Sequence, residues 1–318
     1  MQCSNNLKQL SLAVLNHESA TKVFPVNQIG PGQSNGQGGF RTGYYSWIVP
    51  LLPYFEQGNI YSQFSLSINN GDGSDFKVSS THPNAKAVSS KIGTLLCPSD
   101  VPSSSNEIVL GSANPAGSSY AGNAGWSSYA TGFERERTTP GSFNGVIALL
   151  HPSVSVSWHS RSAIGFRDVT DGSSNTAMIS ERLIQTGNSS EQIRNGDERL
   201  QSLHVLERYE PLPRIVQQMQ SSHVHIRESA HIGRSWSSGM PLIAPTYLHV
   251  QVPNGLIGHY STSQFQGDFV VTSSSRHTGG ANLALVDGSV RFVSSNVSQE
   301  IWWAFGSRNE GRLISFDE

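Results

Sequence analysis

The chain has 318 residues, of which 14% are charged, and its 21 basic and 23 acidic side chains leave a formal net charge of −2. The basic residues are scattered, which argues against a nucleic-acid partner, because such proteins usually present a clustered cationic face. A hydrophobic fraction of 36% with 31 Gly and 15 Pro indicates a folded chain rich in turns, and no apolar run approaches the roughly twenty residues that a membrane helix needs.

The N-terminal segment is predicted to be a helix from Ser4 to about Thr21. Apolar residues recur there at helical spacing, at Leu7, Leu10, Val14 and Leu15. Ser4 is a suitable N-cap, and Pro25 follows the predicted end. This segment should therefore pack one apolar stripe against the rest of the protein.

Beyond the helix, short apolar or aromatic runs such as Tyr44–Leu52 alternate with clusters of Gly, Pro, Ser and Asn. This pattern is typical of β-strands joined by loops. Residues 182–233 differ, because they hold most of the charged residues of the second half, and Pro211 and Pro213 interrupt two stretches of helical character. We interpret them as an inserted lobe.

Residues 282–293 carry the clearest local signal, a β-hairpin with Asp287 and Gly288 at a two-residue type I′ turn. The predicted register pairs Leu285 with Val290 and Leu283 with Phe292. All four side chains then share one face of the ribbon, as a half-buried antiparallel pair requires. A short helix or anchor containing Trp302 and Trp303 is expected to follow.

Five segments carry a family resemblance when they are taken in chain order. They are residues 3–10 with Phe24 and Pro25, Cys97–Asp100, Ser119–Gly125, Arg167–Thr176 with Glu181, and Arg276–Phe292 with His277, Asp287 and Gly288. In this order they resemble the bacterial domain-of-unknown-function family 1559. Members of that family have a prepilin-type N-terminus and a C-terminal His-x9-Asp-Gly motif.

The resemblance implies an α+β, pilin-like or pseudopilin-like fold. Its N-terminal helix, residues 1–25, would pack on an antiparallel β-sheet with long loops, within a β-rich head of residues 26–318 that includes the lobe at 182–233. Family members usually carry a leader and an apolar helix upstream of this point, so we expect such a segment to precede Met1 in the full-length protein. The implied location is the cell envelope, periplasmic or at the cell surface, with membrane anchoring and with copies of itself or related subunits as partners.

The two cysteines, Cys3 and Cys97, form no Cys-x-x-Cys pair, and this spacing excludes a cysteine-based zinc cage. Spacing alone leaves a long-range disulfide and two buried free thiols equally open. The oxidising envelope location implied by the resemblance favours the Cys3–Cys97 bridge.

Two motifs suggest a metal but have simpler explanations. His277 and Asp287 invite a catalytic or metal interpretation, yet the predicted turn explains Asp287, and His277 could order its loop. Asp171, Ser173 and Asn175 form an oxygen-rich loop of the kind that binds calcium, and Asx-turns explain that loop equally well. Calcium is thus an option, and no cofactor is required.

The leading hypothesis is a non-enzymatic envelope protein with a structural or assembly role. The alternative is a glycan- or calcium-binding surface module, in which Tyr44, Trp47 and Trp126 would stack on sugars if they were exposed, although such aromatics more often form the core. A remote third option is a metal-dependent hydrolase that uses His277 with His223 and His225, which would share one face of a strand.

Overall fold

A computed structural model gives the fold of the chain. It describes residues 1–30, 43–72, 77–100, 110–127, 130, 143–150, 162–187, 192, 196–200, 202–220, 231–240, 243–260 and 269–311, with the backbone alone at 202–205 and 269.

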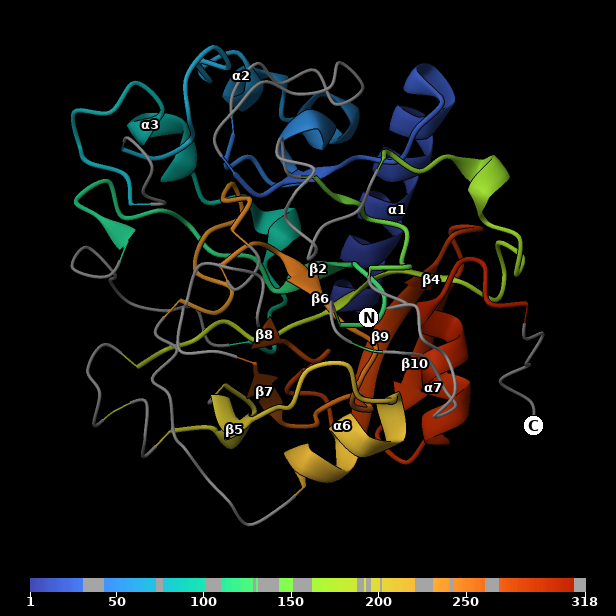
Figure 1. The fold of residues 1–318 in the computed structure, drawn as a ribbon. Coiled ribbons are helices and arrows are strands. Elements are labelled where there is room, and N and C mark those ends of the chain that lie inside the picture. The colour runs from blue at the N-terminus through green and yellow to red at the C-terminus, as the bar shows by residue number, and fades with distance from the viewer. Residues whose placement is uncertain are drawn as a thin grey trace.

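The chain forms both helices and strands, and Figure 1 labels most of them. The α-helices are α1 (Gln2–Thr21), α2 (Gly58–Tyr61), α3 (Ala85–Val88), α6 (Leu212–Met219) and α7 (Gln299–Gly306). The 3-10 helices are η1 (Val49–Phe55), η2 (Gly93–Leu95), η3 (Phe166–Asp168) and η4 (Glu198–Leu200). The strands are β1 (Asn27–Gln28), β2 (Tyr120–Asn123), β3 (Leu149–Leu150), β4 (Ala177–Glu181), β5 (Ser202–Val205), β6 (Thr246–Tyr247), β7 (Ile257–His259), β8 (Phe269–Val270), β9 (Gly280–Leu285) and β10 (Val290–Ser294).

The main sheet has five strands in the order β10-β9-β4-β2-β6. Its first four strands pair antiparallel, while β6 runs parallel to β2. A three-stranded sheet, β5-β7-β8, and the short pair β1-β3 complete the described strands. The predicted α+β class is confirmed, with a sheet that is mixed rather than wholly antiparallel.

Helix α1 lies against β9, β4 and β10, on one face of the main sheet (Figure 1). The predicted stripe faces inward, since Leu7, Leu10 and Val14 have no exposed surface. They belong to the same hydrophobic core as Ala284 and Val286 of the C-terminal hairpin. Burial of this stripe is what holds the helix to the head, at roughly 1.5–3 kcal/mol for each large side chain.

A second core covers the other face of the sheet. There Leu283 and Leu285 of β9 share a cluster with Trp302 and Trp303 of α7, which confirms the predicted helix after the hairpin. Helix α6 adds Leu212, Ile215, Val216 and Met219 to the same cluster. The sheet is therefore buried on both faces, and the described part of residues 182–233 shares this core through α6.

The start of α1 differs from the prediction. The helix begins at Gln2, so Ser4 lies inside the first turn, where its hydroxyl donates to the carbonyl of Met1 at 2.8 Å. The helix ends through Lys22, whose left-handed backbone (φ 63°) closes the last turn three residues before Pro25. Within the described residues, no helix combines the length and apolar character needed to cross a bilayer.

The run Tyr44–Leu52 was predicted as strand and is mostly not one. Tyr45 forms an isolated bridge with Ser238, and the rest enters η1. The reason is Pro50 at the start of η1 and Pro53 within it, because proline has no backbone N–H for a strand ladder and its fixed φ suits a helical turn.

The predicted hairpin is present, but its strands pair one residue away from the predicted register. Val290 pairs with Ala284 and Phe292 with Asn282, because the loop has three residues rather than two. The amide of Gly288 donates to the carbonyl of Leu285, and Gly288 alone in the turn has a positive φ (83°), which is the turn-plus-bulge form of the hairpin. The shift leaves Phe292 53% exposed.

Replacing Leu10 with Ala should lower the free energy of unfolding by about 2–5 kcal/mol, because it opens a cavity between α1 and the sheet. The matched control is Leu12→Ala on the same helix, where the side chain is 59% exposed and the expected change stays within about 0.5 kcal/mol. Denaturant unfolding of both variants checks this. Equal losses would show that the sheet does not hold α1 through its apolar stripe.

Candidate functional site around the disulfide

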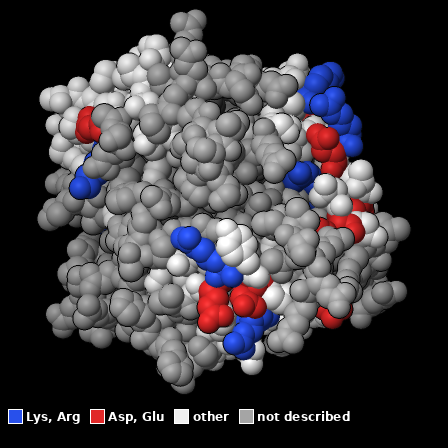
Figure 2. Space-filling model, viewed as in Figure 1, with Lys and Arg blue, Asp and Glu red and all other residues white. Residues whose placement is uncertain are grey.

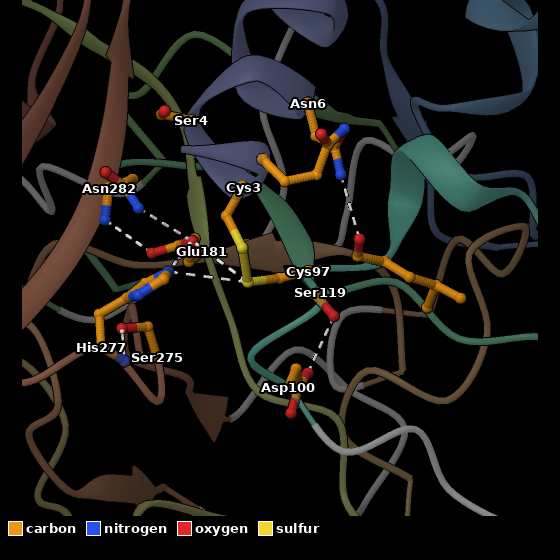
Figure 3. The surroundings of a disulfide bond; sticks show 12 residues. Cys3, Ser4, Asn6, Cys97, Asp100, Ser119, Glu181, Ser275, His277 and Asn282 are labelled. Carbon is orange, nitrogen blue, oxygen red and sulfur yellow. Dashed lines mark hydrogen bonds and ion pairs between the residues drawn. A yellow bond between two sulfur atoms is a disulfide. The ribbon is translucent and has the colours of Figure 1, made fainter.

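A disulfide joins Cys3, in the first turn of α1, to Cys97, two residues after η2, and Figure 3 shows its surroundings. The two cysteines are 94 positions apart in sequence and are 4% and 5% exposed. The bond thus ties the beginning of the helix to a distant loop in the interior.

A buried carboxylate lies beside this bond. Glu181 ends β4, and its side chain is 2% exposed. Asn282 of β9 holds both carboxylate oxygens, since its backbone amide donates to Oε2 at 2.7 Å and its side-chain amide donates to Oε1 at 3.1 Å. A carboxylate removed from water needs such donors, because burying an unpaired charge is costly.

His277 completes the cluster. Its Nε2 lies 3.0 Å from Oε1 of Glu181 and 3.7 Å from Sγ of Cys97, and the same Oε1 is also 3.7 Å from that sulfur. A disulfide sulfur carries no proton, so the imidazole N–H donates to the carboxylate. The His277 side chain is 25% exposed, which brings one edge of an otherwise buried site to solvent.

The loop that carries His277 is held in place by Asp197 and Arg199. Arg199 donates to the carbonyl of Ser275 at 2.5 Å, and Asp197 pairs with both Arg199 and Arg276, the latter at 3.0 Å. Burial alone would raise the pKa of Asp197, but hydrogen bonds from Arg199 and the charges of the two arginines outweigh it and lower that pKa. Residues 197–199 therefore help to position His277.

Polar contacts also fix the protein around the two cysteines. The Tyr120 hydroxyl donates to the carbonyl of Cys3 at 3.2 Å, and burial raises the pKa of that phenol. The Asn6 side chain donates to the carbonyl of Leu96 at 3.1 Å, and the Ser119 hydroxyl donates to Asp100 at 2.9 Å. The backbone on both sides of the bridge is thereby held in place.

The five segments of the family resemblance meet at this site. Each segment contributes one residue to the contacts around the disulfide. In order from the first segment to the fifth, these residues are Cys3, Cys97, Tyr120, Glu181 and His277. The cysteines and His277 were predicted from the sequence as candidate site residues, whereas Glu181 and Asn282 were not. The available signal was the single acidic residue that closes the apolar strand 177–181.

The predicted calcium loop lies apart from the disulfide contacts. Both carboxylate oxygens of Asp171 accept backbone amides near the C-terminus, from Glu310 at 2.7 Å and Gly311 at 2.8 Å. Ser173 accepts the amide of Asp287 through its carbonyl, and Asn175 donates to the carbonyl of Asp171. These contacts fasten the C-terminal segment and the hairpin turn, and calcium binding stays a prediction.

The aromatic residues proposed for sugar stacking are in the core. Tyr44 is 7% exposed, and Trp47 and Trp126 have no exposed surface. Each indole N–H donates to a backbone carbonyl, of Pro245 for Trp47 and of Trp303 for Trp126. Their rings are therefore covered by other buried side chains and are not open to a sugar.

The other predicted residues are distributed differently. Asp287 and Gly288 form the hairpin turn, where the Asp287 carboxylate accepts the amide of Ser289 at 2.8 Å. His223 and His225, from the hydrolase option, lie outside the described residues. On the face shown in Figure 2, acidic and basic side chains of the described residues lie next to one another and form no patch of a single sign.

Fold and site together define an α+β protein whose N-terminal helix is covalently fastened to its sheet-bearing head beside a buried Glu–His pair. The chain belongs to the family described as protein of unknown function (DUF1559), whose model matches residues 1–300. Searches of curated proteins and of solved structures gave no match.

Replacing both Cys3 and Cys97 with Ala should lower the free energy of unfolding by about 4–5 kcal/mol, the loop-closure value for a bridge that spans 94 residues. Denaturant unfolding of the oxidised wild type, the reduced wild type and the double variant measures the loss. The double variant and the reduced protein should lose similar amounts. A variant as stable as the oxidised protein would contradict a stabilising role for the bridge.

Asp197→Asn should destabilise the protein near neutral pH but not in strong acid. The folded-state pKa of Asp197 is lowered, so its stabilising contribution is present above the unfolded value of about 3.9 and is lost as the pH falls through the lower folded value. Unfolding free energies of variant and wild type, measured over a pH series, should converge in acid. A difference independent of pH would contradict this assignment.

Proposed function

We propose that this chain is a non-enzymatic, pilin-like structural subunit of the cell envelope, in which α1 links the head to an anchor and to neighbouring subunits. The observation that carries the proposal is the fastening of α1. It is a 20-residue helix packed on the sheet through its apolar stripe and tied at its first turn by a disulfide.

The outer face of α1 remains available to a neighbour. Its exposed residues are Gln2, Asn5, Lys8, Gln9, Leu12, Asn16, Ser19, Ala20 and Thr21. Seven of these nine are polar, and Leu12 is the one large apolar side chain among them. A face of this kind can pack against another subunit through hydrogen bonds and an apolar contact at Leu12. Because it is mostly polar, it is also stable in water without a partner.

The geometry at the start of α1 is compatible with an upstream anchor. Met1 is fully exposed, so the residue at the start of α1 is open to solvent. The disulfide lies within the first turn of α1, next to the point where an upstream segment would join the helix. A force transmitted through the anchor would therefore reach the head through a covalent bond.

The disulfide also supports the proposed location. Such bonds form and persist in oxidising compartments, including the periplasm and the cell surface, and are rare in the cytosol. The chain contains two cysteines, and they are bonded to each other. An envelope protein with this pair carries no unpaired thiol.

Cysteine crosslinking of the full-length gene product in intact cells tests the proposal. Leu12→Cys, on the outer face of α1, should give a dimer band with a bifunctional thiol reagent, because copies are expected to lie side by side along this helix. The control is Tyr209→Cys, on the loop before α6. Its exposed fraction of 60% matches the 59% of Leu12.

The native cysteines do not interfere, since both are in the disulfide. Crosslinking at position 12 but not at position 209, with the protein in the membrane fraction, would support the assignment. Equal crosslinking at both positions, no crosslinking at either, or a protein that stays in the cytosol would contradict it.

A further inference from the structure

The disulfide site contains four side chains that are all zinc ligands by type. Cys3, Cys97, Glu181 and His277 each point one ligand atom into the cluster, and these atoms lie within 4.8 Å of one another. Zinc in proteins is bound by thiolate, imidazole and carboxylate, in most cases by four ligands in tetrahedral geometry. The absence of a Cys-x-x-Cys pair had argued against a cysteine-based zinc site, but the fold brings distant residues together.

The spacing of these atoms suits a tetrahedral site. Zinc bonds of about 2.0–2.3 Å place neighbouring ligand atoms roughly 3.3–3.8 Å apart. Sγ of Cys97 is 3.7 Å from both Nε2 of His277 and Oε1 of Glu181, and those two atoms are 3.0 Å apart. On reduction the two bonded sulfurs would separate to this spacing, and Nε2 of His277 and Oε1 of Glu181 would need to move apart by about 0.3 Å.

The surroundings also resemble the support of a metal site. Asn282 holds the Glu181 carboxylate with two N–H groups, and the amide of His277 donates to the Ser275 hydroxyl at 3.0 Å. Such outer contacts orient metal ligands and tune their affinity. Because His277 is partly exposed, a small ion can reach the cluster from solvent. The thiol of another protein could not reach it, since both sulfurs are buried.

We propose that this cluster is a redox-gated zinc site, independent of the structural function proposed above. In the oxidised protein the sulfurs bond to each other and no metal is held. In the reduced protein the two thiolates, the Glu181 carboxylate and neutral His277 bind one Zn²⁺. The metal then replaces the disulfide as the link between α1 and the head.

The two states differ by two electrons. A dithiol reductant breaks the S–S bond and leaves as its own disulfide, while each protein sulfur takes up one proton. Zinc binding then releases these two protons as two Zn–S bonds form, and the proton on Nε2 of His277 moves to Nδ1. Overall, protein disulfide, dithiol and Zn²⁺ give the zinc bis-thiolate, the oxidised reductant and two protons.

Metal binding to the reduced and the oxidised protein tests the proposal. The protein is reduced with a phosphine, which leaves no competing thiol, and is titrated with Co²⁺ as a visible probe of tetrahedral thiolate coordination. We expect one Co²⁺ per reduced chain, displaced by one Zn²⁺, and no stoichiometric binding to the oxidised protein. Metal analysis after gel filtration gives the count.

Variants identify the ligands. Glu181→Gln and His277→Ala should each weaken binding by at least about 10-fold, the lower end of what loss of an outer contact costs. Their controls are Glu56→Gln, at an exposed position, and His82→Ala, outside the cluster, and these should bind as the wild type does. Circular dichroism of each oxidised variant establishes that it is folded.

Several results would overturn the proposal. They are no binding to the reduced protein, equal binding to the oxidised protein, unchanged affinity in both Glu181→Gln and His277→Ala, and unfolding of the reduced chain with zinc present. A purely structural Glu–His contact predicts the first of these outcomes.

Discussion

The covalent link between the first turn of α1 and the loop after η2 is the constraint on which the rest of the structure depends. It fixes one end of the helix. The other end is held by weaker contacts: His17 bonds to the carbonyl of Val23 at 3.1 Å, and Glu18 accepts the amide of Phe166 at 3.4 Å. With both ends fixed, the apolar stripe of α1 has one orientation in which it meets the sheet.

The topology of the sheet explains why distant segments meet at the disulfide. Glu181 ends β4, the central strand, and pairs in register with Tyr120 of β2 on one side. On the other side β4 pairs with β9, which supplies Asn282. The loop before β9 carries His277. A residue at the end of the central strand is therefore flanked by two other segments, and α1 brings in Cys3 from above one face.

Some of this arrangement follows from sequence and some does not. The periodic apolar pattern predicts α1, because one face of that helix is buried along its length. The segment with Trp302 was expected only as a short helix or an anchor, and α7 buries all of Trp302 to Gly306. The hairpin was predicted, but its register was not, since Asp-Gly suits both a two-residue turn and the observed three-residue loop with one left-handed glycine. His277 and Asn282, the partners of Glu181, lie 96 and 101 positions away from it in sequence, so no local sequence pattern predicts these contacts.

The polar contacts of Glu181, His277 and Asn282 beside the disulfide are not explained by stability alone. A buried charge and its hydrogen bonds often stabilise a protein no better than well-packed apolar side chains of similar volume, because desolvation offsets the attraction. The disulfide and the buried apolar stripe already fasten α1. The contacts of Glu181 therefore add little that the fold needs for stability, yet they require His277, Asn282 and the strand end to meet in a single geometry. Such a requirement is expected where the positions of the atoms matter, whether to set the register of the strands or to present ligands, and a core built only for stability would not impose it.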